Sequence, residues 1–225
     1  EAVIEKPYIL LTDYRLTENA DIFPLMNKMA AENKKGLVII AENVEQHALA
    51  TLVINLPNVI NPETRKLGTF PSICINLPSV EGRKEFLEDL AVITGGKVFT
   101  ESKGDKIENA EIADLGRAER FISRREESII IGPKGKKQHI QDAIVGLRMA
   151  MNLEKDEKQK KELLHRLGRF TNSVGVIKVG AVTDNEQKTL RYKVEDCVNS
   201  VRSAYQHGVV AGGGFSLLRI KTSSP

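Results

Sequence analysis

LVIIAENVEQHALATLVIN, residues 37–55, sets a run of aliphatic residues directly before a helical pattern. Residues 37–40 have the length and the β-branched content of a buried strand, and residues 47–55 have the apolar spacing of a helix. The same order occurs upstream, where a strand pattern at residues 8–11 precedes a helical stretch at about residues 20–32. Strand and helix patterns that alternate along a chain predict an α/β fold.

The alternation continues to about residue 131. We predict a strand at residues 73–75, a helix at 83–94 closed by Gly95 and Gly96, a strand at 97–99, and a hairpin from 120–122 to 129–131. These elements lead us to expect one compact domain over the first 130 residues, with a mixed sheet flanked by helices.

The next part of the chain is helical and highly charged. Ile140, Ile144 and Leu147 recur at helical spacing, which predicts a pair of helices over about residues 138–169 with a break near residues 152–156. A strand at residues 174–179 and a long polar helix at about residues 184–207 are expected after it, followed by a glycine-rich turn.

The composition excludes several classes of protein. Hydrophobic residues make up 41% of the 225 residues and charged residues 28%, which is typical of a globular domain, and no run approaches the roughly 20 apolar residues of a membrane-spanning helix. The 33 basic and 30 acidic residues are spread along the chain, whereas a nucleic-acid-binding surface gathers its basic residues on one face. We therefore expect neither a membrane nor a nucleic acid as a partner.

Metal and nucleophile chemistry are not expected either. Cys74 and Cys197 lie far apart, neither has a second cysteine at metal-site spacing, and the four histidines are mutually distant. Free cysteines of this kind fit a reducing compartment. The sequence has no Gly-x-Ser-x-Gly motif, so a serine hydrolase is not expected.

The first long helix pattern carries more apolar residues than one face can bury. Ile22, Leu25 and Met29 follow the helical period and can line a core. Phe23, Met26 and Ala30 form a second stripe, displaced by one residue. Because one helix cannot bury both faces against one sheet, we expect the second stripe to remain outside this core.

The second helix pattern repeats this feature. Ala48 and Leu52 form one stripe, whereas Leu49 and Val53, joined by Ile54, form another. A strand separates the two helices in the sequence, and a right-handed crossover then places both helices on the same side of the sheet. The two second stripes are expected to border a groove with apolar walls.

Two interpretations of this groove stay open from the pattern alone. Another domain could cover it, or it could bind other proteins, since large exposed apolar patches usually mark interaction sites. A methionine in such a groove favours varied partners, because its side chain is flexible and polarizable.

Residues 208–214, GVVAGGG, directly follow the long helix. Glycines let backbone amides approach a phosphate closely, so Gly212 and Gly213 are candidate phosphate contacts; a helix end explains the run equally well. Asp196, inside the long helix, could orient a water molecule, or it could belong to a solvated face.

Several stretches, in the same order across nearly the whole chain, resemble the group I chaperonins, the ring-forming and ATP-driven protein-folding machines. They are PYILLTD at residues 7–13, LVIIAENVE at 37–45, ALATLVIN at 48–55, LEDLAVITGG at 87–96, VIKVGA at 176–181, VED at 194–196 and GVVAGGG at 208–214.

The resemblance implies three parts. Residues 1–173 would be the apical, polypeptide-binding domain, residues 174–207 the C-terminal part of the intermediate domain, and residues 208–225 the start of the equatorial domain. In this family a groove between two apical helices binds unfolded polypeptides and, alternately, the mobile loop of a small lid co-chaperonin. The matching positions in this chain are Phe23, Met26, Leu49, Val53 and Ile54.

The resemblance also implies a nucleotide cycle in the intact protein, with ATP and magnesium as cofactors and a seven-membered ring as the assembly. Asp196 matches the aspartate that helps to activate the water that attacks the γ-phosphate, and Gly212 and Gly213 match a turn that contacts the nucleotide. The family's phosphate loop and magnesium ligand have no match in residues 1–225, so this stretch by itself is expected to be monomeric, without cofactor and inactive toward ATP.

Three departures from the family pattern qualify the resemblance. The loop at residues 77–82 lacks the family's glycines, residues 56–70 contain an insertion, and Asn172 and Ser173 replace a glycine pair that serves as the hinge of the apical domain. They indicate a divergent member, from a mitochondrial matrix, a plastid-type organelle or a bacterial cytoplasm.

Two alternatives are retained. One is a paralogue with a structural or signalling role that folds no clients. The other is a small-molecule enzyme of the α/β class, which would need a polar, partly buried cluster at the carboxyl ends of its strands.

Overall fold

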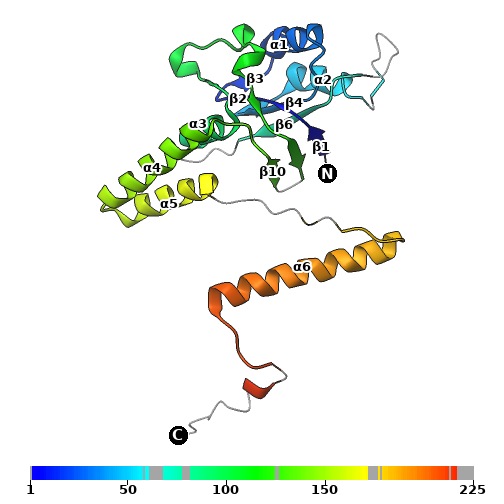
Figure 1. The fold of residues 1–225 in the computed structure, drawn as a ribbon. Coiled ribbons are helices and arrows are strands. Elements are labelled where there is room, and N and C mark those ends of the chain that lie inside the picture. Colours follow the sequence, from blue (N-terminus) through cyan, green and yellow to red (C-terminus); the bar gives the residue numbers. More distant parts are fainter. Residues whose placement is uncertain are drawn as a thin grey trace. The chain divides into compact units, whose positions relative to one another are not determined.

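The computed structural model describes residues 2–57, 59–60, 68–77, 82–124, 127–171, 177, 179–212 and 214–216, except for the side chain of Gln46. The chain divides into two compact units, Glu1–Val174 and Gly175–Pro225 (Figure 1). The first unit thus ends one residue after the domain boundary at residue 173 that the resemblance implies. Of the described helices, none has an apolar run long enough to cross a bilayer.

A mixed, largely parallel sheet forms the centre of the first unit. Its strand order is β6-β4-β2-β7, and β8 pairs with β2 in the antiparallel direction. The strands are β2 (Tyr8–Thr12), β4 (Leu37–Ala41), β6 (Ser72–Asn76), β7 (Val98–Phe99) and β8 (Gly116–Arg117). All residues of β2 and β4 are buried, so these two strands are covered on both faces.

The side chains of the central strands alternate between two cores. Leu10 and Ile39 point into one hydrophobic cluster, and their neighbours Ile9 and Val38 point into the other. This alternation follows from the pleat of a strand, in which successive side chains leave on opposite faces. The α/β class predicted from the sequence is therefore confirmed, with a sheet that needs helices on both sides.

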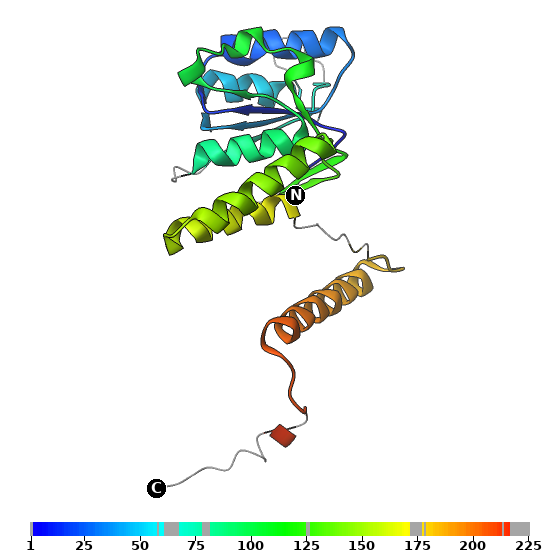
Figure 2. The ribbon, with the colours of Figure 1, turned by 60° about the vertical axis from the view of Figure 1, so that its left-hand side comes forward.

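Two helices, α1 (Asn19–Ala31) and α2 (Gln46–Ile54), cover the first face side by side (Figure 2). Each follows a parallel strand, β2 or β4, and the right-handed crossover expected from the sequence brings them together. A short parallel pair, β3 (Arg15–Leu16) with β5 (Asn43–Val44), joins the segments that lead into them. Three single-turn helices follow β7 along the chain: η1 (Glu101–Lys103), η2 (Ile107–Asn109) and η3 (Ile112–Asp114).

Helix α3 (Arg83–Thr94) lies on the opposite face (Figure 2). It ends where the sequence predicts, at Gly95, whose φ of 76° is the left-handed conformation that glycine adopts without strain. The predicted hairpin is also present, as β9 (Arg120–Ser123) and β10 (Ser128–Ile131). The sequence analysis missed β1 (Ala2–Glu5), which adds to β9 as a third antiparallel strand.

The predicted helical pair consists of α4 (Lys137–Leu153) and α5 (Glu157–Thr171). One carboxylate anchors it to the rest of the unit. Asp89 on α3 is 3% exposed and accepts hydrogen bonds from Arg166 at 2.7 and 3.1 Å and from Arg169 at 2.7 Å. The Arg169 guanidinium also stacks 4.8 Å from the ring centre of Phe86. The compact unit thus extends past residue 130, where the strand and helix alternation ends, to include this pair.

The second unit contains α6 (Asp184–His207). Thr183 caps its start, where the Thr183 hydroxyl accepts the Glu186 N–H at 3.3 Å, and Gly208 caps its end. This helix is less uniformly polar than expected, because Val198, Val201 and Tyr205 lie at helical spacing along it and are exposed. The predicted strand at residues 174–179 falls largely outside the described residues. So do the proposed hinge at Asn172 and Ser173, residues 61–67 of the insertion, and residues 78–81 of the altered loop.

The buried carboxylate of Asp89 gives the first prediction. Asp89→Asn removes the charge that two arginines share, and breaking a buried ion pair by removing one partner typically costs about 3 kcal/mol. We expect a loss of this size in the free energy of unfolding, measured by urea denaturation. Glu88→Gln, on the exposed side of the same helix, is the matched control and should change stability by less than about 0.5 kcal/mol. Equal midpoints for the two variants would contradict this role for Asp89.

Candidate polypeptide-binding surface on helices α1 and α2

The start of α1 is set by a reciprocal cap. The carboxylate of Asp21 accepts the N–H of Thr17 and that of Glu18 at 3.1 Å each, and the Glu18 side chain in turn accepts a backbone N–H of the first turn. Such a capping box satisfies amide groups that would otherwise lack a partner at a helix start. It fixes the position in the sequence at which α1 begins.

Only part of the predicted second stripe of α1 is exposed. Phe23 is 51% exposed, as expected, but Met26 is only 7% exposed and belongs to the core. The assignment of Met26 to an exposed stripe was therefore wrong. Met26 lies four residues after Ile22 and three before Met29, and both spacings place it on the same helical face as these two core residues.

Helix α2 divides as the sequence predicts. Ala48 and Leu52 are buried in the core, while Leu49 is 41% exposed and Val53 is 42% exposed. These last two are one turn apart on a helix, so their side chains are neighbours. Ile54 is half-buried at the end of the helix.

A hydrogen bond identifies the seam between the two helices. The Thr51 hydroxyl donates to the Asn19 side-chain oxygen at 2.6 Å, which joins the middle of α2 to the start of α1. Phe23 is one turn beyond Asn19, and Ile54 is one turn beyond Thr51, so both lie on the flanks that face this seam. Leu49 and Val53 continue the apolar surface over the solvent side of α2.

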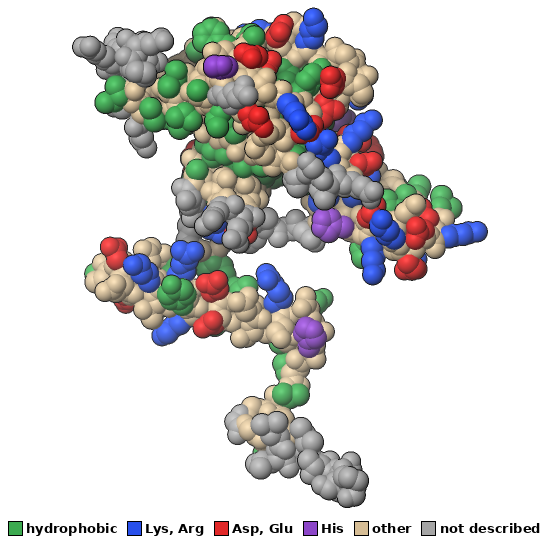
Figure 3. Space-filling model, turned by 180° about the vertical axis from the view of Figure 1, so that it is seen from behind, with side chains coloured by type: hydrophobic (Ala, Val, Ile, Leu, Met, Phe, Trp, Pro, Cys, Tyr) green, Lys and Arg blue, Asp and Glu red, His purple; other side chains and the backbone are tan. Residues whose placement is uncertain are grey.

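We call Phe23, Leu49, Val53 and Ile54 the α1–α2 surface. Figure 3 shows hydrophobic side chains gathered on this side of the first unit. Met26 lies in the same core cluster as Ala48 and Leu52, and it supports this surface from within instead of lining it. The surface contains no catalytic group, so what it can do is bind another apolar surface by excluding water.

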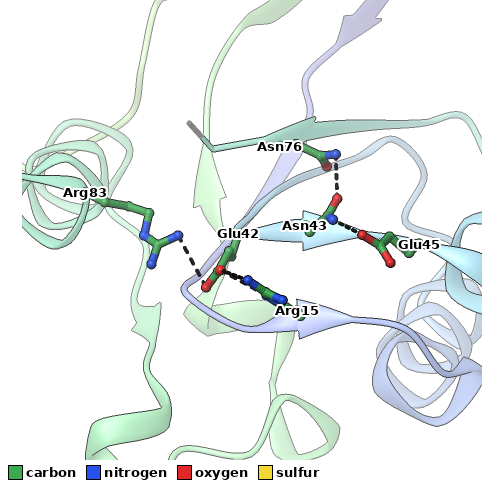
Figure 4. A network of polar contacts seen from close by, with 6 residues as sticks. All are labelled: Arg15, Glu42, Asn43, Glu45, Asn76 and Arg83. Atoms are coloured by element: carbon green, nitrogen blue, oxygen red, sulfur yellow. Dashed lines mark hydrogen bonds and ion pairs between the residues drawn. The ribbon is translucent and has the colours of Figure 1, made fainter. Parts of the chain in front are cut away.

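The structure also reveals a polar network that the sequence analysis did not identify. It lies at the carboxyl ends of the parallel strands (Figure 4). Glu42, directly after β4, accepts hydrogen bonds from Arg15 at 2.8 and 2.9 Å and forms an ion pair with Arg83 of α3 at 3.3 Å. The hydrogen bond from Arg15 holds the pKa of the Glu42 carboxyl below its ordinary value.

Amide groups complete this network. The Asn76 side chain donates to Asn43 at 2.7 Å, and the Asn43 amide donates to Glu45 (Figure 4). The rule that ligand sites lie at the carboxyl ends of parallel strands could have identified Glu42 and Asn76, because each stands at the end of an apolar run. The network joins β3, β5, β6 and α3, and its carboxylates already have partners within the protein.

Metal and thiol chemistry have little support in the described residues. No group of three or more histidine, cysteine or acidic side chains in the described part of the chain could hold a metal ion. Burial raises the pKa of the Cys74 thiol to about 11, so this cysteine stays protonated near neutral pH. Cys197 lies on the exposed surface of α6.

The nucleotide-site candidates lie in the second unit and are not brought together there. Asp196 is an exposed residue of α6, about 16 Å along the axis from the end of that helix at His207. Gly212 lies beyond this end, in a turn where the Phe215 N–H donates to its carbonyl at 3.3 Å. Gly213 lies outside the described residues.

The chain was also compared with models of known protein families, and none of them matches it.

The different burial of two residues of α1 gives the second prediction. Met26→Ala should lower the free energy of unfolding by about 2–4 kcal/mol, because it leaves a cavity in a packed core. Phe23→Ala, three residues away on the same helix, should cost less than about 1 kcal/mol, because half of that ring is already in water. Urea denaturation of both variants measures the difference, and equal losses would contradict the placement of Met26 in the core.

Proposed function

We propose that this protein is a molecular chaperone of the chaperonin type and that its α1–α2 surface binds apolar segments of non-native polypeptides. The observation that carries the proposal is the exposure of Phe23, Leu49 and Val53 on two neighbouring helices. These residues match the positions that form the polypeptide-binding groove in the group I chaperonins, which the sequence resembles.

The physical basis of such binding is water exclusion. Apolar burial contributes about 25 cal/mol per Å², so each partly exposed side chain of the surface contributes on the order of 1 kcal/mol when a client covers it. The effect has no direction and depends little on sequence. This suits a surface that must accept many different unfolded segments.

The remaining features of the proposal rest on the resemblance. The lid co-chaperonin would bind the same surface in alternation with clients, and the intact protein would form a seven-membered ring. ATP, with magnesium, would drive the movement that withdraws the surface and releases the client, with Asp196, Gly212 and Gly213 in contact with the water or the nucleotide. The compartment would be a mitochondrial matrix, a plastid-type organelle or a bacterial cytoplasm.

One observation favours a second candidate, a small-molecule enzyme. The polar network around Glu42 lies where α/β proteins bind ligands. Against this, Arg15 and Arg83 already bind the Glu42 carboxylate. The Asn76 side chain is hydrogen-bonded to Asn43, and Asn43 is hydrogen-bonded to Glu45. A ligand would have to displace these contacts, so we favour polypeptide binding. The third possibility, a paralogue with a structural or signalling role, predicts no capture of clients.

The third prediction tests polypeptide binding directly. Leu49→Glu and Val53→Glu each place a carboxylate in the α1–α2 surface, and a client could cover it only at the cost of desolvating the charge. We expect each variant to bind a denatured model protein at least about tenfold more weakly than the unchanged chain. The chain contains no tryptophan, so the tryptophan fluorescence of the client reports binding without background.

Val145→Glu is the matched control. Val145 on α4 is 40% exposed, close to the 42% of Val53, and it lies outside the α1–α2 surface. This variant should bind the client as the unchanged chain does. Circular dichroism and thermal unfolding verify that all variants are folded. Undiminished binding by folded Leu49→Glu and Val53→Glu proteins would reject the proposal.

A further inference from the structure

A large apolar cleft lies on the opposite side of the central sheet from α1 and α2. Its volume is about 1010 Å³, and it runs between β6, α3, β10 and α5. Ile75, Leu90 and Ile130 are among its lining side chains, and Leu164 of α5 is 57% exposed there. The proposed client-binding surface does not include any of these residues.

Three contacts hold the wall formed by α5 in position. Arg166 and Arg169 both bind the buried carboxylate of Asp89, and Arg169 stacks on Phe86. The cleft is therefore bounded by an element that is tied to α3 by charge-assisted hydrogen bonds, which are stronger than neutral ones.

The size of the cleft favours a polypeptide over a small molecule. Pockets for small ligands and cofactors range from about 300 to 1,000 Å³ and enclose most of their ligand. This cleft is at the upper end of that range, and Ser128, Ile130 and Ile131 of β10 are among the residues that line it.

Among the described residues, strand β10 pairs with one strand only, β9, so its other edge is open. It is the last strand in the order β1-β9-β10 within the described residues. The Arg124 N–H donates to the Glu127 carbonyl at 2.8 Å, which fixes the phase of the antiparallel ladder. In this register, the backbone N–H and C=O groups of Ile129 pair with β9. Those of Ser128 and Ile130 point away from β9. An open edge of this kind can accept another strand.

The charges at the cleft favour a partner that carries a carboxylate. Lys161, His165 and Arg169 are among the described residues that line it, and none of those residues is acidic. Asp89 is shared between two arginines, so it balances only one of their charges.

From these features we infer that the cleft binds an extended polypeptide strand that adds to the open edge of β10. The strand has apolar side chains at alternate positions, which enter the cleft, and an acidic residue that meets Lys161 on α5. Alternate side chains of a strand point to opposite faces, so its remaining side chains face water and can be polar. This inference does not depend on the proposed function.

The probe for the test is a fluorescent nine-residue peptide with valine at alternate positions, threonine between them and aspartate at its end. A second peptide has the same side chains but carries N-methyl groups on the amides that would pair with β10. Fluorescence anisotropy with the whole chain should show binding of the first peptide and at least about tenfold weaker binding of the second, because N-methylation removes the backbone donors. Equal binding of the two peptides would overturn strand addition.

The matched variants are Leu164→Glu in the cleft and Leu153→Glu at the end of α4. Both leucines are exposed, at 57% and 81%, and Leu153 does not line the cleft, so both variants should fold. Leu164→Glu should weaken binding of the first peptide about tenfold or more, and Leu153→Glu should leave it unchanged. Val53→Glu should leave unchanged the part of the binding that N-methylation removes, which separates this site from the α1–α2 surface.

Three results would overturn the inference. The first is unchanged peptide binding by a folded Leu164→Glu protein. The second is binding of dodecanoate in the cleft without binding of the peptide, which would indicate a small-molecule site. The third is self-association in analytical ultracentrifugation that Leu164→Glu abolishes while the peptide fails to bind, which would indicate a contact between two copies of the chain.

Discussion

The first unit depends on one constraint: its central strands are buried on both faces, and each covering helix can bury only one side against them. Strands β2 and β4 direct alternate residues into two cores, so helices must pack on both faces. On the first face, α1 and α2 use one stripe each for the core. The apolar residues that remain, Phe23, Leu49 and Val53, are left partly in water, and their exposure is the physical basis of the proposed function.

The same constraint explains what could be predicted from the sequence. Periodicity identified the two central strands, the positions of α1 to α6, and the exposure of Leu49 and Val53, because these features depend on local spacing. It failed for Met26, whose position on the helix borders both stripes. The two stripes of a helix are only about 100° apart, so small differences in packing decide on which side a residue between them falls.

Features that need several distant segments could not be predicted. The Glu42 network combines residues from β3, from the end of β6 and from α3, and Asp89 meets arginines that lie about 80 positions later in the chain. No local sequence pattern encodes contacts between residues so far apart in the chain. The cleft along β10 has the same origin: it exists because Asp89 positions α5 beside the edge of the hairpin. The unit therefore has two apolar surfaces, one on each face of its sheet, with different geometries. One is an open helical surface, and the other is a cleft beside an edge strand.

The most direct test of the central claim is to identify which residue touches a captured client. A photo-reactive amino acid, benzoylphenylalanine, is placed at position 53 or 145, and the folded protein is irradiated with a denatured model protein bound. The account predicts abundant adducts from position 53 and few from position 145. Adducts that form from position 145 but not from position 53 would contradict it.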